Sequence, residues 1–154
     1  MAEERRSEMK IRNMVESDAE DLMEVLGDPD VMTYIEPPYS MEEVKDFIRD
    51  AGLGESPAVY SAENDDGEFV GYVIWHDYDE DSMEIGWLLK KKYWGKGYAT
   101  ALTKELAARA AAMGKKAVIE CDPEQEITKK IALKAGFEYK GIEDDCCVYV
   151  KEFK

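Results

Sequence analysis

One stretch of this chain decides how it folds: Lys92-Tyr93-Trp94-Gly95-Lys96-Gly97-Tyr98-Ala99-Thr100. It lies between an apolar run, Ile85 to Leu89, which predicts a strand, and an alanine- and leucine-rich segment, Ala99 to Met113, which predicts a helix. A glycine turn that opens a helix leaves N–H groups unpaired at the positive end of the helix dipole. The stretch therefore suits an anion such as a phosphate, although a plain glycine turn capping a helix would have the same sequence.

Outward from this turn, the chain has the pattern of alternating strands and helices. Two capping boxes, Ser17-Asp18-Ala19-Glu20 and Ser40-Met41-Glu42-Glu43, open the first two expected helices, and Gly27 ends the first of them. Asn64-Asp65-Asp66-Gly67 predicts a hairpin between two strands. We expect strands at Lys10–Met14, Pro57–Ala62, Glu68–His76, Met83–Leu89, Ala117–Cys121, Phe137–Gly141 and Cys146–Phe153.

Two further helices follow the glycine turn. The first runs from Gly97 to Met113 and stops at Gly114. Asp122 is expected to cap the second, which ends at Gly136. Its inward residues are predicted to be Ile127, Ile131 and Ala135.

The composition indicates a single domain, residues 1–154, with a charged leader over residues 1–9. The chain has 20 Lys plus Arg against 35 Asp plus Glu, a formal net charge of -15, which argues against nucleic acid or an anionic membrane as a partner. It has neither a signal-peptide core nor a membrane-spanning apolar run. Three unspaced cysteines fit reduced thiols, so a cytoplasmic location is expected, with no metal site.

Three motifs in this order resemble the Gcn5-related N-acetyltransferase (GNAT) family. Trp94-Gly95-Lys96-Gly97-Tyr98-Ala99 resembles its pyrophosphate loop, with Trp where Gln or Arg is usual. Asp122-Pro123-Glu124-Gln125-Glu126-Ile127-Thr128 and Lys134-Ala135-Gly136-Phe137-Glu138-Tyr139 resemble two later segments. The resemblance runs from Lys10 to the C-terminus and is strongest to the branch of ribosomal-protein-alanine and small-amine acetyltransferases.

The resemblance implies an α/β (α+β) fold, with a mixed, mostly antiparallel twisted sheet of six to seven strands and about four helices, split after the fourth strand. It also implies acetyl-CoA (coenzyme A) as cofactor. The backbone of the fourth strand, at Trp87, Leu88 and Leu89, would pair with the pantetheine arm. Gln125 stands where the family often has a cofactor-contacting Asn. The diphosphate would rest on N–H groups of Gly95, Lys96, Gly97, Tyr98, Ala99 and Thr100.

Catalysis in the family transfers acetyl directly to an amine, which must first lose a proton to a base. Glu84 matches a strand glutamate that many members carry near the amine, and Glu120 is the rival base. The tyrosine that often protonates the leaving thiolate is replaced by Ala132, so Thr128 becomes the candidate donor. For His76, the single histidine, a surface position is favoured over a substrate contact.

Substrate recognition is assigned to Tyr34 and Glu36, because aromatic walls and a carboxylate suit a cation. The alternative is a proline-stiffened loop that packs its tyrosines on the domain. The acceptor could be a small-molecule amine or a peptide, and the final strands could supply a homodimer interface. A non-catalytic acyl-CoA-binding regulatory module on the same fold remains the alternative function.

Overall fold

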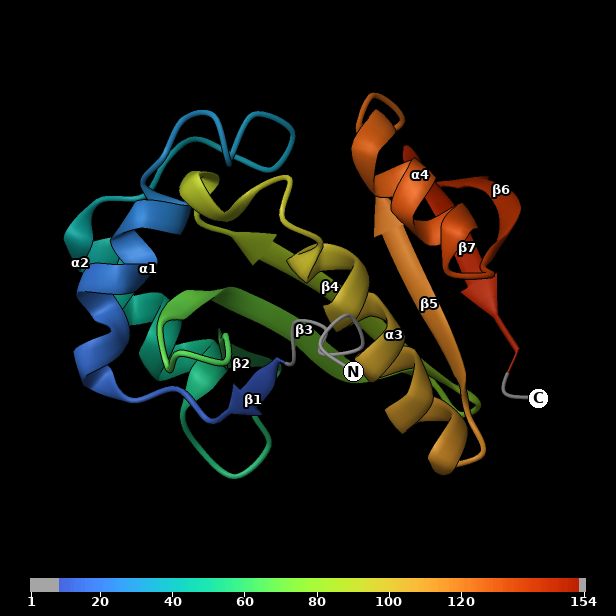
Figure 1. The fold of residues 1–154 in the computed structure, drawn as a ribbon, viewed down its shortest axis with the longest axis horizontal. Coiled ribbons are helices and arrows are strands. Elements are labelled where there is room, and N and C mark those ends of the chain that lie inside the picture. Colours follow the sequence, from blue (N-terminus) through green and yellow to red (C-terminus); the bar gives the residue numbers. More distant parts are fainter. Residues whose placement is uncertain (1–8, 153–154) are drawn as a thin grey trace.

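Seven strands form one sheet within residues 9–152, the part of the chain that the computed structural model describes (Figure 1). Their order is β1-β2-β3-β4-β5-β7-β6, and every neighbouring pair is antiparallel except β4 with β5. This confirms the predicted mixed, mostly antiparallel sheet. The strands are β1 (Lys10–Arg12), β2 (Val59–Glu63), β3 (Phe69–Asp79), β4 (Ser82–Leu89), β5 (Lys116–Cys121), β6 (Glu138–Glu143) and β7 (Cys146–Lys151).

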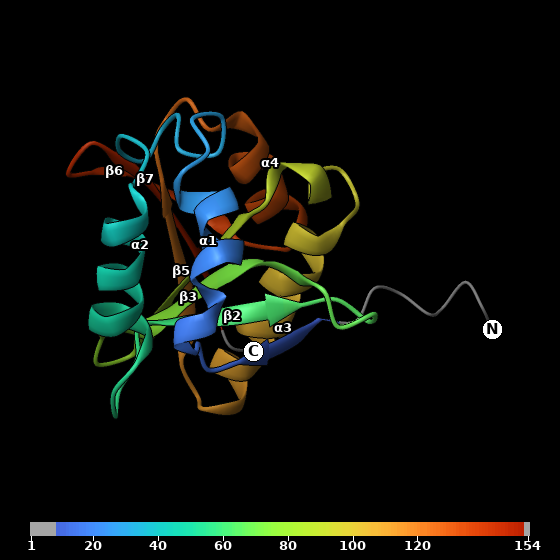
Figure 2. The same ribbon diagram turned by 90° about the vertical axis from the view of Figure 1, so that its left-hand side faces the viewer.

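Four α-helices in the described residues cover the two faces of the sheet: α1 (Ala19–Leu26), α2 (Met41–Phe47), α3 (Tyr98–Ala112) and α4 (Glu126–Lys134). A π-helical turn, Ile48–Gly52, continues α2. Figure 2 shows α1 and α2 on one side of the sheet and α3 on the other. The bounds of α3 lie within one residue of the prediction.

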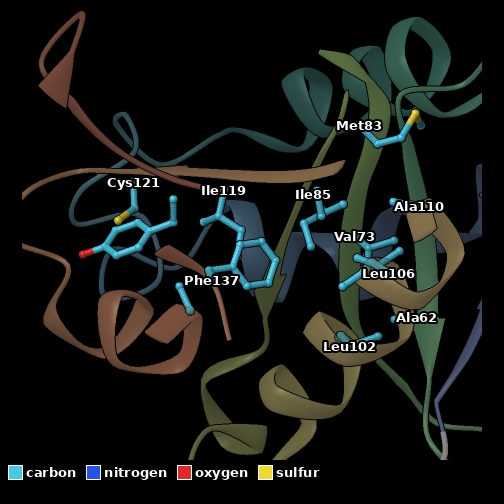
Figure 3. Packing of buried hydrophobic residues seen from close by; sticks show 14 of the residues in the cluster. Ala62, Val73, Met83, Ile85, Leu102, Leu106, Ala110, Ile119, Cys121 and Phe137 are labelled. Atoms are coloured by element: carbon cyan, nitrogen blue, oxygen red, sulfur yellow. The ribbon is translucent and has the colours of Figure 1, made fainter. Parts of the chain in front are cut away.

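Each face has its own apolar core. On one face, Leu22 and Val25 of α1 pack with Val44 of α2 and with Tyr72 of β3. On the other face, residues of α3 pack on strands from both halves of the sheet (Figure 3). The second core includes Val73, Ile85, Leu102, Leu106, Ala110, Ile119 and Phe137. Because strands alternate their side chains between faces, Glu84, next to Ile85 in β4, projects away from α3.

The sheet splits between β4 and β5. The two strands pair only from Ser82 to Glu84 with Lys116 to Val118. Beyond these residues β5 pairs with β7 alone, and in Figure 1 the later parts of β4 and β5 spread apart. The split after the fourth strand is therefore confirmed, and Glu84 is the last residue of β4 paired with β5.

The first capping box was wrong. Ser17 does not cap α1, because the chain enters this helix through a 3-10 turn, Glu16–Asp18. Asp18 is instead turned inward, where it accepts hydrogen bonds from the guanidinium of Arg12, the Val15 N–H and the Ser61 hydroxyl, all at 2.9–3.0 Å. The second box is confirmed: Ser40 Oγ accepts from the Glu43 N–H at 3.2 Å, and Glu43 accepts from the Ser40 N–H.

The start of α4 also differs from the prediction. Asp122 does not cap this helix: its carboxylate accepts from the Glu124 N–H in a preceding turn, and α4 starts at Glu126. The shift turns Ile127 outward, with 72% of it exposed, so its predicted inward orientation was wrong. Ala132 becomes the buried residue of the helix. Residues 1–8 of the predicted leader and Phe153 of the last predicted strand lie outside the described residues.

Candidate active site

The glycine turn has the backbone conformation that the sequence predicts. Gly95 and Gly97 have φ angles of +76° and +86°, in the left-handed region that favours glycine. Gly97 directly precedes α3, and no side chain in the described residues caps this helix end. The first N–H groups of the helix, from Tyr98 to Thr100, therefore have neither intrahelical partners nor a cap. A Cβ at either glycine would meet nothing within 4 Å, which leaves room for an anion on that side of the turn.

Side chains around the turn hold it in place. Trp94 Nε1 donates to the Leu89 carbonyl at 3.2 Å, which fastens the turn to the end of β4. The Tyr98 ring lies 5.8 Å from that of Tyr93, and its hydroxyl accepts from Asn64 Nδ2 at 3.3 Å. Trp94 and Tyr98 thus position the loop, while Lys96 is exposed. Contacts to Asn64, in the hairpin between β2 and β3, were not visible in the sequence.

The split gives β4 one open edge. Trp87, Leu88 and Leu89 pair with Val73, Tyr72 and Gly71 of β3 on one side. On the other side, no described β5 residue pairs with them. The peptide groups on that side thus face the gap between the strands and could pair with an extended, amide-containing ligand. This geometry and the open turn at α3 fit the cofactor arm and diphosphate that the resemblance implies.

Glu84 lies where the two strands part, and His76 lies directly opposite it on β3. His76 Nε2 is 3.5 Å from Glu84 Oε1. Burial raises the pKa of Glu84, the electrostatic effect of His76 opposes this, and the nearby Glu120 raises it further. A carboxyl whose pKa is raised is better matched to accepting a proton near neutral pH. The expectation of a surface position for His76 left this contact out.

Glu120, on β5, has a different environment. Its Oε2 accepts a hydrogen bond from the Tyr78 hydroxyl at 2.8 Å, which raises the pKa of Tyr78 to about 12. Tyr78 and His76 are two residues apart on β3, and Glu84 and Glu120 influence each other electrostatically. Four polar side chains from three strands therefore gather on the sheet face away from α3. Because side chains alternate between the two faces of a strand, the sequence could have predicted that His76 and Tyr78 lie on the same face of β3.

The two predicted residues near α4 have separate surroundings. Gln125 folds back, and its Oε1 accepts from the Asp122 N–H at 2.8 Å, which leaves the amide nitrogen to contact a ligand. Thr128 is half-buried in the first turn of α4. Ala132 is fully buried and has no group that could donate a proton. The cofactor contact of Gln125 and the acid role of Thr128 remain predictions.

The loop between α1 and α2 faces the end of β5. Tyr34 and Glu36 line a pocket of about 550 Å³ whose other wall includes Asp122 and Glu124. Tyr34 is 43% exposed and so is not packed on the domain. Tyr39 is packed: it contacts Phe47 and donates to Glu36 at 2.9 Å. Tyr39 thus packs on the domain, as one alternative for this loop predicts, whereas Tyr34 lines the pocket, as the other predicts.

Two general features bear on the class of site. Residues 9–152 contain no group of three or more His, Cys, Asp or Glu side chains that could hold a metal ion. Within the same residues, no helix combines the length and the apolar character needed to cross a membrane.

Comparison with known proteins identifies relatives over most of the chain. The profile of the acetyltransferase (GNAT) domain matches residues 8–138. The uncharacterized protein YkkB of Bacillus subtilis (strain 168) is 28% identical over 144 residues, covering 85% of this chain and 82% of that protein.

Solved structures show the same fold. A GNAT-family acetyltransferase from Bacillus anthracis superposes with a TM-score of 0.84 at 22% identity, covering 95% of both chains. The spermidine N-acetyltransferase of Vibrio cholerae, in complex with CoA and spermine, superposes with a TM-score of 0.76 at 16% identity, covering 93% of both chains.

Proposed function

The chain belongs to the GNAT acetyltransferase domain family, and from this premise we propose that it transfers an acetyl group from acetyl-CoA directly to the primary amine of a small cationic substrate. One observation carries the proposal: Glu84 lies at the point where β4 and β5 part, and the chain that leaves the unpaired end of β4 forms the glycine turn at the start of α3. The open edge of β4 that is proposed to bind the cofactor thus begins next to the candidate base.

The residues that would hold the cofactor are mainly backbone groups. The open edge of β4 at Trp87–Leu89 suits the amide-containing arm, and the N–H groups from Gly95 to Thr100 suit the diphosphate. Lys96 is exposed and adds positive charge near the turn. Bound acetyl-CoA would supply the acetyl carbon that the amine attacks and the thiolate that leaves.

Glu84 is the proposed general base. An amine of the lysine type has a pKa of roughly 10.4, so it arrives protonated at neutral pH and must lose one proton before it can attack. Burial raises the pKa of Glu84, which favours its acceptance of that proton, directly or through a water molecule. Glu120 already accepts from Tyr78 and is better suited to attract the cation than to take its proton. Thr128 is the proposed hydroxyl near the leaving sulfur.

The cationic class of substrate is supported by charge and by shape. The pocket at Tyr34 and Glu36 combines an aromatic side chain with three carboxylates, those of Glu36, Asp122 and Glu124. The formal net charge of -15 attracts cations over a longer range. The Vibrio cholerae relative in fold is a spermidine N-acetyltransferase, which makes polyamines the first substrates to test.

The test is free-thiol release from acetyl-CoA across a panel of amines, with acetyl-CoA binding measured by calorimetry. The panel holds a triamine, a diamine, an aminoglycoside, a lysine ester and a peptide with an alanine N-terminus. Release that is fastest with polyamines supports the proposal. Thiol release with the peptide alone would indicate that the substrate is a protein N-terminus and not a small amine. Tight binding without release on any amine would favour the regulatory module.

A further inference from the structure

We propose that His76 takes over the proton that Glu84 removes from the amine and passes it to solvent, so that the two side chains work as a relay. This inference rests on the proposed function, because it concerns the base of that reaction. His76 would be a positioning and proton-relaying residue that contacts Glu84.

The backbone brings the two side chains together. His76 and Glu84 are directly opposite each other on the antiparallel strands β3 and β4, and so project from the same face of the sheet. Nε2 of the imidazole is 3.5 Å from Oε1 of the carboxylate. Catalytic hydrogen bonds are often long before substrate binds, and a shift of a few tenths of an ångström would bring this pair to hydrogen-bond distance.

The second nitrogen of His76 decides how many protons the pair can hold. Nδ1 lies 3.0 Å from the carbonyl oxygen of Asp77, which can only accept a hydrogen bond, so Nδ1 carries a hydrogen. In the neutral ring, Nε2 then presents a lone pair toward Glu84. In that form the ring has a free site, at Nε2, for the proton that Glu84 removes from the ammonium.

The proton balance is simple. The ammonium loses one proton to Glu84, and the protonated carboxyl passes it to Nε2 of His76, which restores the carboxylate and forms an imidazolium. The imidazolium then releases one proton to water. His76 is suited to this last step because 38% of its side chain is exposed, compared with 24% for Glu84.

Other ionisable groups on β3, β5 and β6 lie around the pair of His76 and Glu84. Glu120 of β5 interacts electrostatically with Glu84, and the Tyr78 hydroxyl of β3 donates a hydrogen bond to Glu120. Glu143 of β6 acts on Tyr78. Asp77 carries its charge outward, where it pairs with Lys115 at 3.2 Å. The ionisable groups around the pair are thus mostly carboxyls.

The test uses steady-state kinetics with the best amine of the panel. His76→Gln keeps the size of the side chain but cannot carry a proton, and kcat should fall about tenfold to a hundredfold with acetyl-CoA affinity unchanged. In His76→Ala, added imidazole should restore part of kcat, whereas it should not restore Glu84→Gln. Glu105→Gln is the control: it removes an exposed charge on α3 that has no contact with the pair, and its kcat should match that of the unaltered protein.

The outcomes separate the relay from the function on which it rests. Thiol release by the unaltered protein, together with full activity of His76→Gln, would overturn the relay and leave the acetyltransferase proposal standing. Loss of activity in His76→Ala without rescue by imidazole would also overturn the relay. Added imidazole can replace a side chain that carries a proton, but it cannot replace one that only holds the structure in place. No release by the unaltered protein with any amine would overturn both. Melting curves of the two His76 variants check that each is folded.

Discussion

At the scale of single residues, Glu84 and Glu120 have the same type of side chain in different surroundings. Glu84 is partly buried beside an imidazole, while Glu120 accepts from a tyrosine hydroxyl. Glu84→Gln should therefore lower kcat about a hundredfold to ten-thousandfold while acetyl-CoA affinity in calorimetry stays unchanged. Glu120→Gln should mainly raise KM for the amine, because it removes charge near the cation. The reverse pattern would make Glu120 the base.

The pH profile gives a second reading of the same residue. Burial raises the pKa of Glu84, and a base must be deprotonated to act. The rate should thus fall as the pH is lowered through a value above that of an ordinary glutamate, about 4.3. Glu84→Gln should lack this acid limb. A limb that persists in the variant would have to come from another group.

The sequence identified Glu84 and Glu120 as candidates, but it did not identify their partners. Register is the reason: the contact of His76 with Glu84 exists because these two positions face each other across β3 and β4. A hairpin with one residue more or less would turn one of them to the other face. The bond from Tyr78 to Glu120 spans 42 residues and depends on the bulge between Asp77 and Asp79.

At the scale of elements, α3 offers a comparison between its own two ends. Gly97 precedes the helix with φ +86°, and Gly114 follows it with φ +74°; a Cβ at either would meet nothing within 4 Å. Alanine at either glycine should cost about 1–2 kcal/mol of stability, the cost of a left-handed conformation. Gly97→Ala should also weaken acetyl-CoA binding in calorimetry, and Gly114→Ala should not. Equal acetyl-CoA affinities of the two variants would mean that the diphosphate does not bind at the glycine turn.

Asp18 joins three parts of the chain through its carboxylate: β1 at Arg12, β2 at Ser61, and Val15, which precedes the 3-10 turn before α1. Asp18→Asn should lower the free energy of unfolding by about 2 kcal/mol in urea titrations at neutral pH, because it removes charge-assisted hydrogen bonds and leaves the partly buried guanidinium of Arg12 paired with Glu63 alone. Asp46→Asn breaks an exposed ion pair with Arg49 and should change stability little.

The pH dependence of that effect has a defined sign. Burial acts to raise the pKa of Asp18, but the hydrogen bond from Arg12 and those from Val15 and Ser61 outweigh it, and the pKa is lowered. The stabilisation is fully present above the usual value of 3.8 and is lost as the pH falls through the depressed native value. The stability difference between Asp18→Asn and the unaltered protein should therefore shrink below about pH 4. A constant difference would contradict this origin.

The capping boxes show what local sequence can and cannot fix. The box at Ser40 formed as predicted because both of its bonds lie within four residues. The box at Ser17 failed because Arg12 and Ser61, far away in sequence, draw Asp18 inward. At α4, the side chain of Gln125 closes a turn on Asp122, so the helix starts later than its apolar spacing suggested. Contacts from outside the segment decided both cases.

At the scale of the whole molecule, a formal net charge of -15 predicts a salt-dependent reaction. The value of kcat/KM for a triamine should fall about tenfold between low salt and 0.3 M salt, because screening weakens attraction over distances beyond about 6–10 Å. A monoamine of similar size should show a much weaker dependence. Equal salt dependence of both amines would mean that the overall charge does not steer the substrate.

The glycine turn also bears on how such proteins diverge. The groups that it offers to an anion are peptide N–H groups, which every residue but proline possesses. The torsion angles of Gly95 and Gly97 should therefore matter more at this place than the side chain of the exposed Lys96. Solved structures with this fold keep its backbone at low sequence identity, as the TM-score of 0.84 at 22% identity illustrates. Ancestry in this fold is accordingly better preserved in backbone shape than in the letters of the sequence.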